Sequence, residues 1–184
     1  MTLDELGDYK QKIVSLFFGS QDIIDLLLPK KNPNYTVQQQ IFGYKDENGN
    51  VVFKGQLFPY FYTDGTGEEA RTFVLVETDA PTIDDNGIFK TINLYIYEFT
   101  DLSLVRLTDA EIVKYSKKGY KGVCRTDVLA MAINRVLSDN NTFGLSGLKL
   151  KNIKVYRPTT NSYYGRVMTY SVKCENIGGD TCGN

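Results

Sequence analysis

Histidine is absent from the 184 residues of the chain. Its absence removes the most common general base near neutral pH, the usual partner of a serine or cysteine nucleophile, and the commonest zinc ligand. Mechanisms that use carboxylates alone stay open, but no paired acidic motif stands out. We therefore expect a protein that is not an enzyme, with no catalytic residues, no metal and no cofactor.

An excess of either charge is also missing, since 21 basic residues face 22 acidic ones and the net charge is −1. A domain that binds duplex nucleic acid usually carries a basic excess, so nucleic acid is disfavoured as the main ligand. No apolar run reaches the roughly 18 residues needed to cross a bilayer. The N-terminus also has no basic segment before an apolar run, as a signal peptide would. These features predict a protein without a membrane partner.

Cysteine is scarce: Cys124, Cys174 and Cys182 are odd in number and have no CxxC spacing. This usage suits a reducing compartment and predicts synthesis in a cytoplasm. Tryptophan is missing, so the aromatic content comes from 13 tyrosines and 10 phenylalanines, which favour strands and contact surfaces. The length and the hydrophobic fraction of 42% suffice for one core. We expect residues 1–184 to form a single α+β domain with a loose tail from about residue 176.

The clearest secondary-structure pattern lies in the C-terminal half of the chain. Between Val128 and Leu137 the apolar residues recur at spacings of three and four, which predicts an amphipathic helix over about 125–138. Thr126 is the expected N-cap. Asp127 then lies in the first turn, where a negative charge meets the positive end of the helix dipole.

An alternating pattern follows this helix and predicts a hairpin. The first strand carries apolar residues between lysines, namely Leu148, Leu150, Ile153 and Val155. Residues 158–162 form the expected turn, and residues 164–174 the second strand. We expect the helix to lie on this hairpin and both apolar faces to be buried.

The rest of the chain completes an α+β fold. Residues 4–28 have helical periodicity in two pieces, and Thr108 with Glu111 forms a capping box for a short helix. Strands are expected over 35–62, 72–78 and 88–99. The last of these is nonpolar on both faces, as a central strand is. We expect a mostly antiparallel sheet packed by the helix at 125–138, with a helical segment at the N-terminus.

Two motifs match catalytic or cofactor patterns only formally. Residues 65–70 fit the GxGxxG/A pattern of dinucleotide sites, but that motif needs a helix after it and a strand is expected here, so we interpret the glycines as a hairpin loop. Ser146 and Lys149 have the SxxK spacing of serine acyl-enzymes, but helical periodicity has ended at this point. A small histidine-free hydrolase therefore stays as an alternative, as does a small monomeric module that binds through its aromatic strands.

A local basic cluster precedes the main helix. It includes Lys117, Lys118 and Lys121, with Tyr115 and Tyr120 interleaved. Such a cluster contacts a phosphate backbone or an acidic protein surface, or else forms an ordinary solvated loop. The sequence leaves these interpretations open.

The C-terminal third combines three segments in order. They are Arg125-Thr-Asp-Val-Leu-Ala-Met-Ala-Ile-Asn-Arg-Val-Leu, then Phe143-Gly-Leu-Ser-Gly-Leu-Lys-Leu, then a strand entered through Tyr164-Gly165-Arg166 and ending at Val172. This order, an amphipathic helix, a glycine-rich turn and strands, resembles the tail terminator (tail-completion) proteins in the neck of tailed bacteriophages. An N-terminal helix ahead of several strands is also similar to that family.

The resemblance implies a structural virion protein with an α+β fold whose subunits form a ring, commonly a hexamer. Such a ring caps the tail tube, ends its growth and provides the docking surface for the head connector. Sheath proteins and passing DNA are further partners that the resemblance leaves open. The protein would be made in the host cytoplasm and located in the neck of the virion. A head-completion or stopper protein of the neck is the nearest alternative.

A closed ring needs an interface in which one patch meets a different patch on the next copy. Because Tyr and Phe are typical interface anchors, the aromatic strands supply the candidates. These candidate interface residues are Phe58, Tyr60, Tyr62, Tyr95 and Tyr97. On the same resemblance, Lys117, Lys118 and Lys121 are the candidates for facing a DNA channel or an acidic partner.

Overall fold

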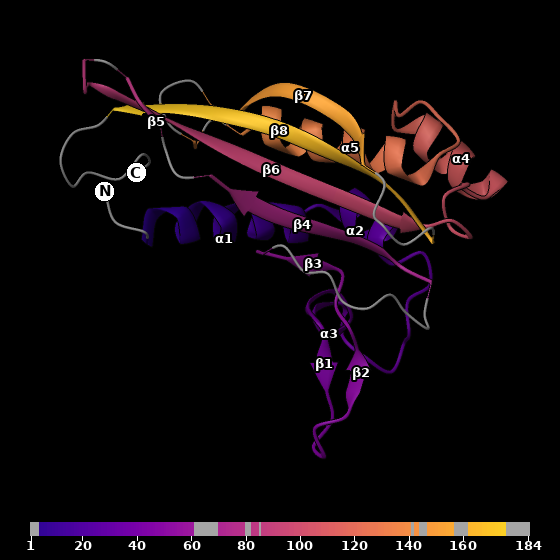
Figure 1. Cartoon of the computed structure of the whole chain (residues 1–184). Helices are drawn as coiled ribbons and strands as arrows, with labels where there is room; N and C mark the ends of the chain where they lie inside the picture. The colour runs from indigo at the N-terminus through magenta and orange to yellow at the C-terminus, as the bar shows by residue number, and fades with distance from the viewer. Residues whose placement is uncertain are drawn as a thin grey trace.

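Figure 1 shows the computed structural model, which describes residues 4–60, 70–79, 82–84, 86–140, 142–143, 147–156 and 162–175. Within these residues, five helices and eight strands form the expected α+β fold. The helices are α1 (Asp4–Gly19), α2 (Gln21–Leu27), α3 (Val37–Phe42), α4 (Asp109–Lys117) and α5 (Arg125–Ser138). The strands are β1 (Tyr44–Lys45), β2 (Val51–Phe53), β3 (Leu57–Phe58), β4 (Thr72–Thr78), β5 (Thr82–Ile83), β6 (Phe89–Asp101), β7 (Lys149–Tyr156) and β8 (Tyr163–Glu175).

The main sheet has six strands in the order β3-β4-β6-β8-β7, with β5 pairing to β6. Its centre is the pair β6 and β8, each 13 residues long, which confirms the central strand predicted over 88–99. The neighbouring pairs are antiparallel except β3 and β4, which are parallel. Because β3 and β4 run parallel, these two strands do not pair as a hairpin. Residues 65–69 of the predicted loop lie outside the described residues.

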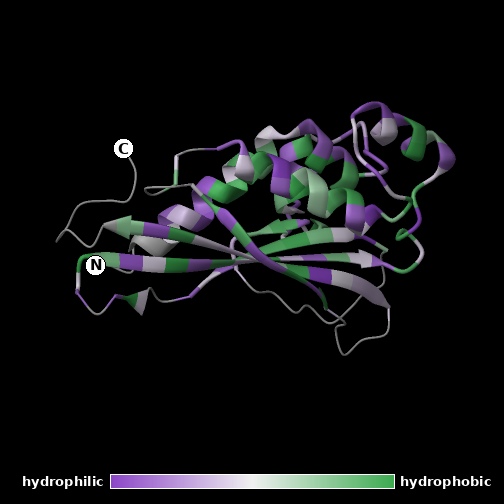
Figure 2. Ribbon diagram, turned by 90° about the horizontal axis from the view of Figure 1, so that it is seen from above, coloured by the Kyte–Doolittle hydropathy of each residue, from purple (hydrophilic) through white to green (hydrophobic). Residues whose placement is uncertain are grey.

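Helices α1, α2 and α5 cover one face of this sheet, as Figure 2 shows from above. α1 packs on β4, and α5 packs on β6 and β8. The bounds of α5 are those that the apolar periodicity predicts, because its stripe is buried against the sheet. The core side chains that the sheet supplies to this layer include Ile92, Leu94, Ile96, Met168, Tyr170 and Val172.

The start of α5 differs from the sequence prediction. Cys124 occupies the N-cap position without a side-chain cap bond, and Thr126 lies inside the first turn. Thr126 is fully buried, and its Oγ1 lies 2.9 Å from Cys124 Sγ. The hydroxyl is thus used within the core rather than as a cap. Cys124 is a free cysteine.

Residues 31–56, which we call the arm, project from one side of the body in Figure 1. The strand expected over 35–62 is wrong for its first part, because residues 37–42 form α3. Thr36 and Gln39 make a reciprocal capping box: Thr36 Oγ1 accepts from the Gln39 N–H at 3.1 Å, and Gln39 Oε1 accepts from the Thr36 N–H at 2.9 Å. The rest of the arm is the hairpin of β1 and β2, whose tight turn contains Gly49 as the sequence predicts.

Two glycines fix the base of the arm. Gly43 and Gly55 have φ angles of 89° and 77°, which residues with a Cβ rarely adopt. A Cβ on Gly55 would also lie 3.1 Å from the carbonyl of Phe42. The Gln56 N–H donates to the Ile41 carbonyl at 2.7 Å, which ties the end of the arm to its beginning. The Val74 N–H of β4 donates to the Gln56 carbonyl at 2.7 Å, so a backbone hydrogen bond also ties the base of the arm to the body.

Candidate interaction surfaces

The edge strand β7 exposes apolar side chains. Leu150, Ile153 and Val155 are 37%, 42% and 51% exposed, and nothing within the described residues pairs with the outer edge of the strand. The expectation that the hairpin buries both apolar faces is therefore wrong for these three residues. Leu148, just before the strand, is buried as expected.

A bulge in β7 gathers these side chains on one face. Leu150 pairs with Tyr170 and Ile153 pairs with Met168, and both partners point toward the helices. The register shifts between Leu150 and Asn152, which brings two residues three positions apart to the same face. Without the bulge, simple alternation would place Leu150 and Ile153 on opposite faces.

The same side chains form one wall of a groove beside α5. Its cavity volume is about 310 Å³. It is lined by Asp127, Ala130, Met131 and Asn134 of α5, Leu150 and Ile153 of β7, and Lys121 and Arg166. Asp127 and Arg166 form an ion pair in this wall, and the rest of the lining is largely apolar. The groove runs along the edge of the sheet, so a strand added to β7 would place side chains in it.

Lysines accompany this apolar edge. Lys149 and Lys154 lie on the face opposite Leu150 and Ile153, and Lys151 lies in the bulge. Pairing β7 with β7 of another copy would bring these lysines together, which is a common device against edge-to-edge aggregation. The edge therefore suits a strand that carries acidic side chains, not a copy of itself.

The sheet face opposite the helices carries a second hydrophobic cluster. Its buried members are Phe58, Leu75, Phe99 and Tyr163, with Phe73, Tyr97 and Tyr156 packed against them. Gly165 of β8 pairs with Phe99, and a Cβ there would lie 2.5 Å from the Glu98 carbonyl and 2.6 Å from Phe99 Cδ1. The glycine of the Tyr-Gly-Arg segment thus leaves room for the Phe99 ring to lie against β8.

The predicted interface aromatics are partly brought together here. Phe58 is buried and Tyr97 packs on the same cluster, where burial raises the pKa of the Tyr97 hydroxyl. Tyr60 is 50% exposed with its ring 5.8 Å from that of Phe58, so it is the best placed of them to meet a partner. Tyr95 lies apart, where its hydroxyl donates to Asp79 and this bond raises its pKa. Tyr62 lies outside the described residues.

One of the three lysines of the predicted basic loop, Lys118, is tied to α2, as is Lys114 of α4. Lys118 pairs with Asp22, and Lys114 Nζ lies 2.5 Å from Asp25 Oδ2. Burial alone would raise the pKa of Asp25, but hydrogen bonds from Lys114 and Lys31 outweigh it and lower that pKa to about 2. Lys117 and Lys121 are exposed. Two of the three predicted lysines are thus displayed, while Lys118 helps to hold the loop.

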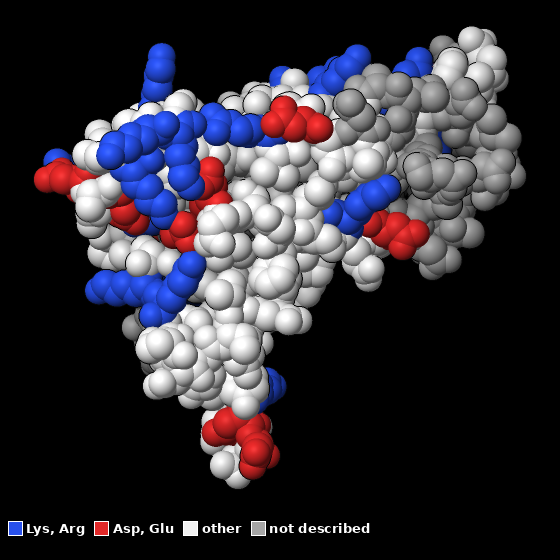
Figure 3. Space-filling model, turned by 180° about the vertical axis from the view of Figure 1, so that it is seen from behind, with Lys and Arg blue, Asp and Glu red and all other residues white. Residues whose placement is uncertain are grey.

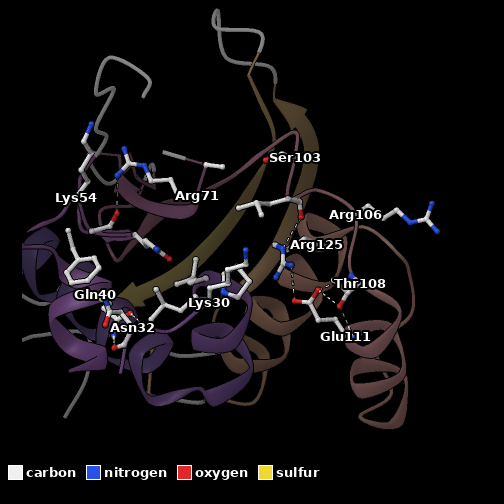
Figure 4. A pocket seen from close by; sticks show the side chains of 18 residues that line it. Lys30, Asn32, Gln40, Lys54, Arg71, Ser103, Arg106, Thr108, Glu111 and Arg125 are labelled. Carbon is white, nitrogen blue, oxygen red and sulfur yellow. Dashed lines mark hydrogen bonds and ion pairs between the residues drawn. The ribbon is translucent and has the colours of Figure 1, made fainter. Parts of the chain in front are cut away.

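A larger basic cleft lies where the arm, α2 and α4 meet (Figure 4). Its cavity volume is about 770 Å³. The basic residues of its described lining are Lys30, Lys54, Arg71, Arg106 and Arg125, and the acidic one is Glu111. Glu111 is neutralised by Arg125, whose Nη2 lies 2.8 Å from Glu111 Oε1. No local pattern in the sequence indicates this cleft, because its basic residues are spread from position 30 to position 125 and never form a local cluster.

A family model called YomW matches residues 20–172 of the chain. The chain belongs to the YomW family. This is a phage-derived family of the Bacillus prophage type, so the chain is a phage-associated protein. No match is found among curated proteins.

The alternative sites weighed from the sequence add little to these surfaces. Within the described parts of the chain, no group of three Cys, Asp or Glu side chains is placed to hold a metal ion. Ser146 and residues 65–69 lie outside the described residues, and Lys149 is an exposed residue at the start of β7. No helix in the described ranges is both long and apolar enough to cross a membrane.

Proposed function

We propose that this phage-associated chain is a structural protein of the phage neck. In this proposal its subunits form a ring, a hexamer in the simplest case, that caps the tail tube and ends its growth. The ring then provides the docking surface for the head connector. Membership of a phage-derived family and the α+β fold with a long edge strand support the proposal.

The exposed apolar edge of β7 is the observation that carries it. A strand of eight residues with three exposed aliphatic side chains is an aggregation hazard unless a partner covers it. Covering the exposed halves of these side chains would stabilise a complex by on the order of 3 kcal/mol. In a protein that works by docking, such an edge is the surface that the partner covers.

The proposal makes the chain non-enzymatic. Docking depends on contact area and charge, so it needs no cofactor, metal or catalytic group. Its partners are further copies of the chain, the tail tube, and the head connector, with sheath proteins added in a contractile tail. The site of action is the neck of the virion.

Electron microscopy tests this function directly. Purified protein is mixed with tail tubes in one sample and with DNA-filled heads in another. We expect rings at the ends of the tubes and little binding to heads. Binding to heads before tubes would favour a head-completion or stopper role, and binding to neither would overturn the proposal.

A matched pair of variants tests the edge strand. Ile153→Arg adds a charge to the apolar face of β7 and should reduce capping of tubes at least tenfold, because it removes apolar contact and places an unpaired charge in the interface. Ile88→Arg is the control, since Ile88 is also exposed but lies away from the groove. Both variants should unfold at the same urea concentration as the parent. Equal capping by the two variants would contradict the role of β7.

A further inference from the structure

The two ends of the arm carry opposite charge. Asp46 and Glu47, in the turn between β1 and β2, are its acidic residues. Figure 3 shows acidic side chains at the free end of the arm, with a basic side chain close by, and basic side chains where the arm meets the body. The basic cleft described above lies at that junction.

The acidic tip has a fixed shape. Asp46 Oδ1 accepts hydrogen bonds from the Asn48 N–H at 2.9 Å and the Asn50 N–H at 2.8 Å, and Gly49 takes a positive φ of 82°. Hydrogen bonds from Asn50 lower the pKa of Asp46, so the carboxylate stays charged under ordinary conditions. Glu47 is exposed beside it. A tip that is already ordered loses little conformational entropy when it binds.

The basic cleft is also organised in advance. Arg71 Nη1 donates to the Gly55 carbonyl at 3.1 Å, and its guanidinium lies 5.1 Å from the centre of the Phe73 ring. Figure 4 shows Lys54 and Arg71 on the arm side of the cleft and Arg106 at its opposite rim, with the Arg106 guanidinium extending outward. With Glu111 paired to Arg125, the described residues of the lining carry a net positive charge.

The tip of an arm has no access to the cleft of its own molecule. The cleft lies at the base of the arm, and the hairpin, held by Gly43 and Gly55, points away from it (Figure 1). Complementary patches that are kept apart within one molecule can meet only between molecules.

We propose that the acidic tip of the arm of one copy docks in the basic cleft of the next copy. This inference rests on the proposed function, because it supplies the contact between neighbours in the ring. The tip and the cleft are different patches, so the contact is heterologous and closes into a ring when the rotation between copies allows it. The occupant of the cleft is thus a second copy of the chain, and its recognition is electrostatic.

Charge reversal tests the pairing. The tip variant is Asp46→Asn with Glu47→Lys, because an asparagine keeps the acceptor that the turn needs. The cleft variant is Lys30→Glu with Arg106→Glu, both of which are exposed side chains. Each variant should weaken assembly at least tenfold, measured by sedimentation in solution and by counting rings on tube ends. A single chain that carries both sets of changes should recover assembly, because tip and cleft are again complementary.

Controls separate this contact from a general effect of charge. Asp139→Lys changes an exposed acidic residue at the end of α5 and should assemble like the parent. Assembly of the parent should also weaken as salt rises from 0.05 to 0.5 M, by roughly tenfold or more for a contact between charged groups.

Three results would overturn the inference. The first is normal assembly by the tip variant, which would leave the proposed function standing if the rings still cap tubes. The second is loss in both single variants without recovery in the combined chain. The third is loss of binding to a short DNA duplex in the cleft variant while assembly persists, since the occupant would then be nucleic acid. A parent protein that neither assembles nor caps tubes would overturn this inference and the proposed function together.

Discussion

The body and the arm use their residues in different ways. In the body, three helices cover one face of a six-stranded sheet, and the long strands β6 and β8 are buried along their helix-facing side. The arm has only a six-residue helix and two short strands, and its order comes from a capping box, a turn and two glycines. The body therefore provides stability, and the arm provides a shaped projection. Substitutions in the body should accordingly change the free energy of unfolding, and substitutions in the arm should change hydrogen exchange locally.

The largest effect is expected in the body, at Gly165. Gly165→Ala places a Cβ 2.5 Å from the Glu98 carbonyl and 2.6 Å from Phe99, so β6 and β8 must shift apart. We expect a loss of about 3 kcal/mol in the free energy of unfolding, measured in urea. Gly7→Ala is the control, because nothing lies within 4 Å of its added methyl group. Similar midpoints for the two variants would contradict the tight packing inferred at this crossing.

A buried carboxyl in the body gives the next effect. Glu98 is fully buried, and within the described residues its two carboxyl oxygens have no hydrogen-bond partner. Burial raises the pKa of Glu98 well above 4.5; Arg166 opposes this shift, while Asp127 and Cys124 add to it. The folded state therefore holds the proton over a pH range in which the unfolded state releases it. Stability should fall as the pH rises from about 4.5 through the folded-state pKa.

Glu98→Gln tests this arrangement, because glutamine has the same shape and no proton to lose. We expect the variant to be more stable than the parent at pH 7, by on the order of 1 kcal/mol. The difference should shrink as the pH falls toward 5. The measurement is the unfolding free energy at several pH values between 5 and 8. A parent that gains stability over this range relative to the variant would contradict a protonated Glu98.

The smallest effect is expected in the arm. Thr36→Ala removes one half of the capping box of α3 and should cost about 1 kcal/mol locally. Hydrogen exchange should become faster at Gln39 and Gln40 and stay unchanged in β6 and β8. The matched change Thr108→Ala in the body should have a wider effect, because Glu111 of that capping box also pairs with Arg125. If both substitutions speed hydrogen exchange over equally wide regions, the arm does not unfold independently of the body.

The same contrast explains what the sequence could predict. The bounds of α5 and the central position of β6 followed from periodic apolar residues, because these residues are buried by contacts along whole elements. The arm was misread because so short a helix has no period to detect, although Thr36 and Gln39 do carry a capping signal. Leu150 and Ile153 are exposed because they lie on the edge strand β7, beside α5. No local pattern in the sequence indicates that β7 is an edge strand.

The candidate surfaces were predicted less well than the fold. Aromatic content pointed to Phe58 and Tyr97, but packing turns them inward and leaves Tyr60 displayed. The lysine cluster was visible in the sequence, yet its ion pairs with α2 were not, because Asp22 and Asp25 lie far from it along the chain. The basic cleft depends on residues from several segments that lie far apart in the sequence, so only the folded chain reveals it.

Deleting the gene from the phage or prophage that encodes the chain tests the central claim most directly. Particles produced after induction would be examined by electron microscopy, with the gene supplied in trans as the control. The account predicts DNA-filled heads without tails, together with unattached tail tubes of uncontrolled length. Complete virions with tails of normal length would contradict it.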